Sequence, residues 1–98
     1  VDYNKLCGMG KTNEILNIEL LSDYWKSLGW GVLEINGHDF SEIKLALASR
    51  PSERIRKPYI IIAHTIKGKG ISFMEGNNDW HYRHLDEENY NKALNELA

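Results

Sequence analysis

The most constraining feature of the sequence is an apolar, largely β-branched run over residues 59–66, Tyr-Ile-Ile-Ile-Ala-His-Thr-Ile. A strand that is apolar at consecutive positions has to be covered on both faces, which is the situation of a central strand in a parallel sheet. We therefore expect this run to be a central, parallel strand with helices on both sides of the sheet. His64, inside the run, is expected to be a hydrogen-bonded histidine of the core.

A loop with alternating lysines and glycines follows this strand, with the sequence Lys-Gly-Lys-Gly at residues 67–70. Glycines permit positive φ or a close backbone approach, and a loop at the carboxyl edge of a sheet presents N–H groups and ammonium charge to an anion. Lys67 and Lys69 are two residues apart, so an extended segment cannot lay both against one wall. We expect one of them to be available to a phosphate-bearing ligand. The alternative is a plain solvated turn, because lysine-glycine loops are common.

Helix and strand signals alternate along the rest of the chain. The expected elements are the end of a strand at residues 1–4, a helix over 17–28 capped by Asn17, a strand over 30–35, a helix of about ten residues, the strand over 59–66, a loop, and a helix capped by Asp86. Such alternation predicts an α/β fold, part of a doubly wound, mainly parallel sheet with helices on both faces. Ligands of this architecture sit off the carboxyl ends of the strands.

The helix after the second strand has a clear start signal. Asp39 and Glu42 have the spacing of a capping box, and Phe40, Ile43 and Leu47 are expected to point inward. Pro51 is expected to end this helix, and a basic cluster is expected to be a solvated connection to the next strand: Arg50, Arg54, Arg56 and Lys57.

Composition and charge limit the partners of the chain. The 98 residues carry a formal net charge of −2, so no overall field draws the protein to nucleic acid or anionic lipid, and any anion site must be local. No apolar stretch of about 18 residues is present, the single cysteine cannot form an internal disulfide, and the start does not resemble a signal peptide. We expect a cytoplasmic protein without membrane or nucleic-acid partners. Because the chain starts as if within a sheet and without methionine, residues 1–98 are expected to be a single partial domain.

Polar groups follow two of the expected strands at their carboxyl ends. Asp2 and Asn4 follow the first strand, and Lys67 follows the last. Asn4 offers a neutral oxygen, and the carbonyl of Leu6, two residues later, could turn toward the same point. Two such oxygens suit a hard cation that is held partly by substrate phosphates, which is the usual arrangement for Mg²⁺.

Four segments in this order resemble the thiamine-diphosphate-binding domain of transketolase, specifically its carboxyl half. They are Asp2-x-Asn4-Lys5-Leu6, Gly37-His38-Asp39, the Ile-Lys-Gly-Lys-Gly of residues 66–70, and Trp80-His81. The resemblance covers nearly the whole chain. It implies that Asn4 and the Leu6 carbonyl bind Mg²⁺ and that Lys67 contacts thiamine diphosphate. It also implies that His81, 14 residues after Lys67 (81 − 67 = 14), contacts both the diphosphate side and the sugar as the catalytic histidine.

The resemblance further implies an activity and an assembly. A transketolase-type transferase of pentose phosphate metabolism moves a two-carbon ketol unit between sugar phosphates, using thiamine diphosphate and Mg²⁺. The Tyr-Arg-His-Leu of residues 82–85 resembles family members made as separate amino- and carboxyl-terminal subunits. The implied partners are the remaining transketolase domains or a partner subunit, in a homodimer or a two-by-two assembly. The family's Gly-Asp-Gly segment and its pyrimidine-binding domain are not in this sequence, so the isolated 98 residues are expected to be inactive.

Two other functions remain open. Deoxyxylulose phosphate synthase, a decarboxylating carboligase, has similar Gly-His-Asp and Lys-Gly-Lys-Gly motifs, although the placement of Trp80-His81 and the Met-Glu-Gly at residues 74–76 favour transketolase. The chain could also be a scaffold segment without a cofactor. His38 is interpreted as part of a turn at a helix entry and is assigned no chemistry.

Overall fold

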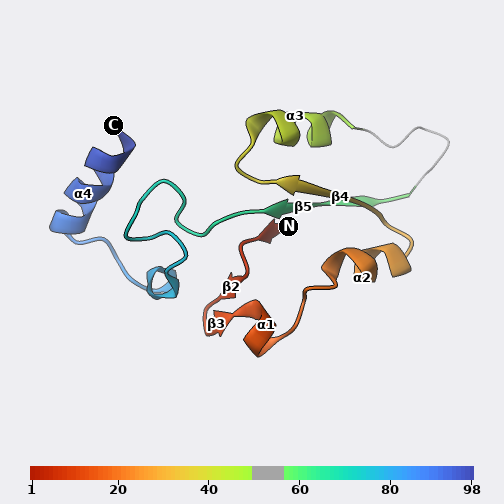
Figure 1. The fold of residues 1–98 in the computed structure, drawn as a ribbon, viewed down its shortest axis with the longest axis horizontal. Helices are drawn as coiled ribbons and strands as arrows, with labels where there is room; N and C mark the ends of the chain where they lie inside the picture. The colour runs from red at the N-terminus through yellow and green to blue at the C-terminus, as the bar shows by residue number, and fades with distance from the viewer. Residues whose placement is uncertain (50–56) are drawn as a thin grey trace.

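The computed structural model describes residues 1–49 and 57–98, and its centre is a three-stranded parallel sheet (Figure 1). The strands are β1 (Asp2–Tyr3), β5 (Tyr59–His64) and β4 (Gly31–Asn36), in the order β1-β5-β4. β5 therefore lies in the middle and runs parallel to both neighbours, as the apolar run predicted. Pro51 and the three arginines of the expected basic connection lie outside the described residues.

The helices α2 (Leu21–Ser27) and α3 (Phe40–Ala48) lie on opposite sides of this sheet (Figure 1). The chain passes from β1 beyond β5 to β4 by way of α1 (Thr12–Ile15) and α2, and then returns through α3 to the central position. Two right-handed crossovers that run in opposite directions along a sheet put their helices on opposite faces. The predicted α/β class, with a parallel sheet covered by helices on both faces, is confirmed.

The packed core of the described residues is small and is centred on β5. Ile62 is 1% exposed and is the largest fully buried side chain among the described residues. Its neighbours in the sheet are fixed by register, because β4 and β5 pair along their whole length from Gly31↔Tyr59 to Asn36↔His64. A continuous parallel ladder with one buried isoleucine at its centre thus positions the carboxyl ends of all three strands.

Two of the three predicted helix caps are confirmed. The Asp39 carboxylate accepts the N–H groups of Ser41 and Glu42 at 2.7 and 3.1 Å and starts α3. The Asp86 carboxylate accepts the Asn89 N–H at 2.8 Å and starts α4 (Glu87–Leu97). A carboxylate at this position satisfies N–H groups that have no partner within the helix.

Three local predictions about helices are wrong. α2 begins at Leu21 and not at Asn17, whose side chain instead accepts the Glu19 N–H at 3.0 Å and forms a local turn. Asparagine makes this alternative bond readily, and it competes with helix capping. Two of the three side chains expected to point inward from α3 do not, since Phe40 is 87% and Leu47 66% exposed. Phe40 occupies the first position of α3, before the helix reaches the sheet. Glu42 completes no capping box, since its carboxylate accepts the Asn36 N–H at 2.7 Å.

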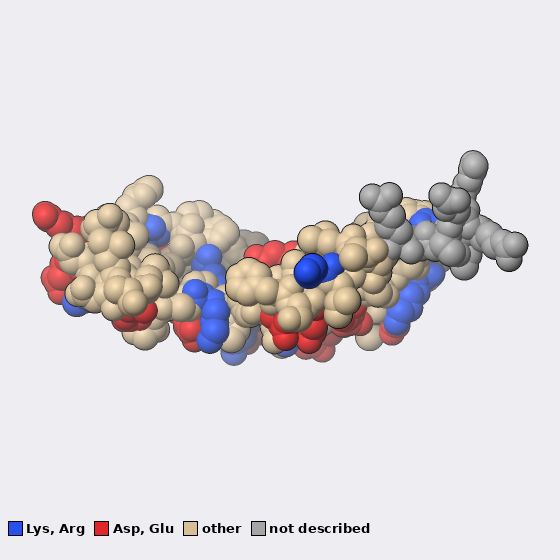
Figure 2. All heavy atoms as spheres, turned by 90° about the horizontal axis from the view of Figure 1, so that it is seen from above, with Lys and Arg blue, Asp and Glu red and all other residues tan. Residues whose placement is uncertain are grey.

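The remaining elements extend away from the sheet. A hairpin of β2 (Leu6–Cys7) and β3 (Gly10–Lys11) follows β1, and a 3₁₀ turn, η1 (Asn78–His81), precedes α4. α4 lies at the end of the molecule farthest from α2 and α3, and the overall extents are 54 × 32 × 15 Å (Figure 1). Acidic and basic side chains are interspersed on the face drawn in Figure 2, which agrees with the small net charge. In the described ranges, no helix is both long and apolar enough to cross a bilayer.

Candidate functional site

The segment after β1 makes a sharp bend that brings an amide oxygen beside a backbone group. Lys5 has a φ of +64°, and the Asn4 Oδ1 accepts the Leu6 N–H at 2.9 Å. A side-chain oxygen that bonds the N–H two residues later closes an Asx turn. The turn uses one lone pair of Asn4 Oδ1 and leaves the other free.

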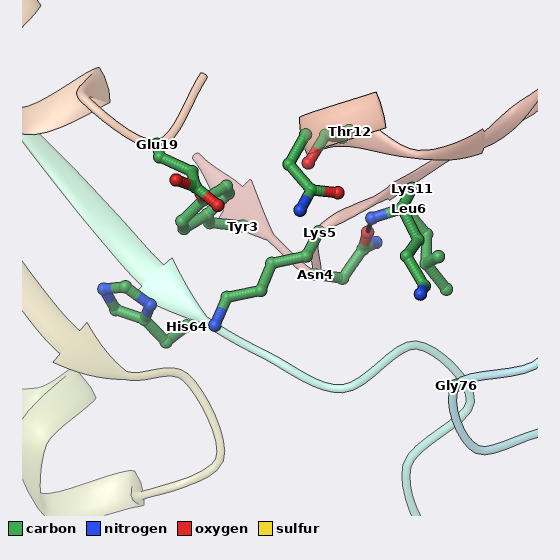
Figure 3. A pocket seen from close by; sticks show the side chains of 10 residues that line it. Tyr3, Asn4, Lys5, Leu6, Lys11, Thr12, Glu19, His64 and Gly76 are labelled. Atoms are coloured by element: carbon green, nitrogen blue, oxygen red, sulfur yellow. Dashed lines mark hydrogen bonds between the residues drawn. The ribbon is translucent and has the colours of Figure 1, made fainter. Parts of the chain in front are cut away.

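A cavity of about 480 Å³ lies at this bend (Figure 3). It is formed where the carboxyl ends of β1 and β5 meet the β2–β3 hairpin, and Gly76 of the loop after β5 also lines it. Figure 3 shows the Lys5 side chain extended toward the carboxyl end of β5. The lining residues are Tyr3, Asn4, Lys5, Leu6, Lys11, Thr12, Asn13, Glu19, His64 and Gly76.

The glycine-rich loop after β5 is tied back on itself. The Gly76 N–H donates to the Lys67 carbonyl at 2.9 Å, so the residue that lines the cavity is bonded to the backbone of Lys67. Gly68 has a φ of +72°, and a Cβ there would stand 2.6 Å from the Met74 carbonyl oxygen. Only glycine permits both this conformation and this approach. The loop is therefore compact, and its Gly76 lines the cavity.

The two lysines of the loop have different surroundings. The Lys69 ammonium lies 3.1 Å from Glu75 Oε1, which also accepts the Gly70 N–H at 3.0 Å. These two contacts, the backbone bond first and the lysine second, lower the pKa of the Glu75 carboxyl below its ordinary value. Lys67 makes no ion pair with any residue in the described part of the chain. Of the two ammonium groups, Lys69 is held by the loop's own carboxylate.

His81 packs against the turn of the β2–β3 hairpin. A Cβ on Gly8 would come within 3.2 Å of the His81 Nε2 and within 2.5 Å of the Tyr82 hydroxyl, so the hairpin and η1 pack tightly here. The Trp80 indole donates to the Phe73 carbonyl at 3.0 Å and anchors this turn. His81 is not among the residues that line the cavity. Of the predicted site residues, the structure brings Asn4 and Leu6 together in the lining of the cavity. Lys67 is bonded through its carbonyl to Gly76, which also lines the cavity, and His81 packs against the hairpin outside the lining.

The oxygen atoms at the bend can bind a hard cation only together with further ligands. Among the described residues, no group of three histidine, cysteine, aspartate or glutamate side chains could hold a metal. The free lone pair of Asn4 Oδ1 and a carbonyl oxygen are neutral, hard ligands that suit Mg²⁺ when phosphate oxygens supply the negative charge. Asp2 is engaged elsewhere, because its carboxylate accepts the Thr65 hydroxyl. The two neutral oxygens therefore fit Mg²⁺ held in common with a diphosphate.

Comparison with known proteins decides the family. All of residues 1–98 match the model of the transketolase thiamine-diphosphate-binding domain. This chain belongs to the transketolase family.

The transketolase relatives include separately made subunits. The chain is 38% identical over 98 residues to an apulose-4-phosphate transketolase subunit of Phocaeicola vulgatus. It is 43% identical over 96 residues to the 6-deoxy-6-sulfo-D-fructose transketolase subunit SqwG of a Clostridium species. These alignments cover 100% and 98% of this chain and 34% of each relative, so the chain spans about a third of the length of these curated relatives. The resemblance to split-subunit transketolases is confirmed.

One pair of residues in this transketolase domain was missed by the sequence analysis. His64 lines the cavity, and its Nε2 lies 2.9 Å from Glu34 Oε2 on the neighbouring strand. This hydrogen bond is the main reason that the pKa of the Glu34 carboxyl lies below its ordinary value. The expected core histidine is hydrogen-bonded, but its side chain is 41% exposed. The signal was a glutamate in the middle of the otherwise apolar Val-Leu-Glu-Ile run of residues 32–35.

Proposed function

We propose that the complete protein transfers a two-carbon ketol unit between sugar phosphates, with thiamine diphosphate and Mg²⁺ as cofactors. In this proposal, residues 1–98 are the carboxyl-terminal portion of its thiamine-diphosphate-binding domain. The observation that carries the proposal is the cavity at the carboxyl ends of β1 and β5, where Asn4 and Leu6 face a loop tied to Lys67. Parallel α/β sheets bind their ligands at this edge.

The roles of the site residues follow from their surroundings. Asn4 Oδ1 and the Leu6 carbonyl supply two oxygen ligands to Mg²⁺, and phosphate oxygens complete the shell. Of the two loop lysines, Lys69 pairs with Glu75, whereas Lys67 makes no ion pair within the described residues. Lys67 therefore offers its ammonium to the diphosphate. His81 is proposed to reach the site from the hairpin side, where it contacts the diphosphate and exchanges protons with the sugar hydroxyls. Thiamine diphosphate, when bound, supplies the carbanion chemistry that cleaves and forms the carbon–carbon bond.

The assembly is part of the same proposal. Two of the relatives are named as single subunits of a transketolase, which supports a partner that carries the other half of the active site. We propose a cytoplasmic protein that works with the remaining transketolase domains or a partner subunit, as a homodimer or a two-by-two assembly. The sugars in the relatives' names belong to those proteins, and for this chain the proposal is limited to a ketose phosphate donor.

The activity is tested on the complete protein with its partner subunit. With thiamine diphosphate and Mg²⁺ present, we expect transfer from a ketose phosphate to an aldose phosphate, and no carboligation from pyruvate. Omission of either cofactor is expected to abolish transfer. Product formation from pyruvate in place of the ketose phosphate would contradict the proposal.

A second function has one observation in its favour. The chain is 44% identical over 48 residues to a 1-deoxy-D-xylulose-5-phosphate synthase of Aliarcobacter butzleri, which is 48% of this chain. Use of pyruvate in the assay above would identify this alternative. A scaffold segment without a cofactor is the third possibility, and it predicts that Lys67→Ala leaves the activity of the complete protein unchanged.

The isolated chain provides a further test of the shared site. Residues 1–98 offer two neutral metal ligands, and no cluster of three potential metal-binding side chains occurs in the described part of the chain. We therefore expect these residues alone to bind thiamine diphosphate and Mg²⁺ too weakly for isothermal titration calorimetry and to be inactive. Tight binding by the isolated chain would contradict a site that is completed by other parts of the protein.

A further inference from the structure

The turn between β4 and α3 is packed directly against the carboxyl end of β5. The Gly37 N–H donates to the His64 carbonyl at 2.8 Å, which prolongs the sheet by one residue. A Cβ on Gly37 would stand 2.4 Å from the Thr65 Cγ2 and 3.2 Å from the His64 carbonyl oxygen. Glycine is therefore required at this position by the close approach of the two chain segments.

The next residue, His38, makes a bond that the sequence analysis did not foresee. Its Nε2 accepts the Ile66 N–H at 2.7 Å, across 28 residues of sequence. The ring nitrogen accepts this bond through its lone pair, which makes Nε2 the acceptor for a backbone N–H group. The backbone of His38 is fixed as well, since its N–H donates to Asn36 Oδ1 at 3.0 Å.

The chain leaving β5 is held from both neighbouring strands. On the β1 side, the Thr65 hydroxyl donates to the Asp2 carboxylate. On the β4 side, the Ile66 N–H donates to His38. Thr65 and Ile66 immediately precede Lys67, so the two bonds together set the direction in which the backbone enters the loop.

We propose that His38 is a positioning residue for the diphosphate site: by accepting the Ile66 N–H it fixes the start of the loop and, through the backbone, the placement of Lys67. The expected effect on cofactor binding rests on the proposed function, because Lys67 is the residue proposed to contact the diphosphate. The hydrogen bond itself does not depend on that function. His38 touches neither cofactor nor substrate, and it acts through the backbone of its partner.

The experiment compares three variants of the complete protein. His38→Ala removes the acceptor, and His38→Gln supplies an amide oxygen of similar reach. Asp86→Ala removes the cap of α4 and is a control for a destabilisation of similar size away from Ile66. Two quantities are measured: hydrogen–deuterium exchange of the Ile66 amide by mass spectrometry, and the Kd of thiamine diphosphate by calorimetry in the presence of Mg²⁺.

We expect His38→Ala to speed exchange of the Ile66 amide and to weaken thiamine diphosphate binding by about 3- to 10-fold, the range that a lost hydrogen bond produces. His38→Gln is expected to recover most of both, and Asp86→Ala to change neither by more than about twofold. Unchanged Ile66 exchange in His38→Ala, or equal losses of affinity in the alanine and glutamine variants, would overturn the inference. A wild-type protein that does not bind the cofactor overturns the proposed function instead. A wild type that binds, with the affinity of His38→Ala unchanged, overturns only the positioning role.

Discussion

The sheet and the carboxyl-terminal arm, residues 65–98, are held together by different interactions. In the sheet, backbone hydrogen bonds run continuously along β5, and Ile62 is buried at its centre. In the arm, carboxylates accept backbone N–H groups: Glu75 accepts from Gly70, and Glu96 accepts from both the N–H and the hydroxyl of Ser72. The sheet thus has a buried centre, whereas charge-assisted hydrogen bonds to carboxylates tie parts of the arm together.

This difference indicates which interactions should be sensitive to pH. Burial does not depend on pH, whereas the hydrogen bonds from N–H groups to a carboxylate weaken when the carboxylate is protonated, because they lose their charge assistance. The pKa values of Glu75 and Glu96 are both lowered by such bonds. The loop that carries Lys67 should therefore respond to acid through Glu75. Substitutions in each region can test this division.

Ile62→Ala is expected to have the largest effect, because it removes the most buried side chain of the sheet. Loss of a buried isoleucine side chain costs about 3 kcal/mol of unfolding free energy. Chemical denaturation of the complete protein measures the change, and exchange protection should fall in β4 and β5 together. A loss of exchange protection confined to the arm would contradict the proposed division between the sheet and the arm.

Gly68→Ala is expected to disrupt the arm alone. The new methyl group would meet the Met74 backbone at a φ of +72°, and strain and overpacking together cost about 2 kcal/mol. Gly29→Ala is the matched control, since Gly29 has a φ of +82° but open space around its Cβ. Exchange of the loop amides should rise in Gly68→Ala and stay unchanged in Gly29→Ala. Equal effects of the two substitutions on the loop would show that the contact with Met74 is unimportant.

The paired helix caps compare the two regions with the same chemistry. Asp39→Ala and Asp86→Ala each remove a carboxylate cap, at α3 beside the sheet and at α4 in the arm. Each should cost about 1 kcal/mol. We expect the first to raise exchange in α3 and the second to raise it in α4, without spread between the regions. Spread from α4 into β5 would argue for one cooperative unit.

The smallest effect is the pH dependence of the loop. The folded-state pKa of Glu75 lies below 4.5, so its contribution to stability is present above pH 4.5 and is lost as the pH falls through the folded-state value. Glu75→Gln should therefore differ from wild type in Gly70 exchange above pH 4.5 and converge with it in acid. Glu88→Gln, at a carboxylate that pairs with the exposed Lys92 side chain in α4, is the control and should show no change at Gly70. A difference between Glu75→Gln and wild type that persists in acid would exclude this origin.

The sheet could be predicted from the sequence because its signals are local and regular. The apolar run of residues 59–66 and the carboxylates Asp39 and Asp86 each indicate an element within a few residues. The start of α2 was misjudged because Asn17 can bond its own turn as well as a helix.

The contacts of the site could be predicted only in part. The proximity of Asn4 and Leu6 follows from their spacing in one turn. The bonds His38–Ile66 and Glu34–His64 join residues 28 and 30 positions apart. These bonds depend on the register of β4 against β5, and no local sequence pattern indicates that register. The pairing of Lys69 with Glu75, which gives the two loop lysines different surroundings, likewise depends on the folded conformation of the loop.

The different surroundings of the two loop lysines give the sharpest test of the proposed diphosphate site. The quantity to measure is the Kd of thiamine diphosphate, by calorimetry with Mg²⁺, for the complete protein and its Lys67→Ala and Lys69→Ala variants. We predict that Lys67→Ala weakens binding by about tenfold or more, because a charge-assisted contact to phosphate is lost. Lys69→Ala, which breaks only an ion pair between exposed groups, should change the Kd by less than about threefold. Equal losses in the two variants, or a larger loss in Lys69→Ala, would contradict the assignment of Lys67 to the diphosphate.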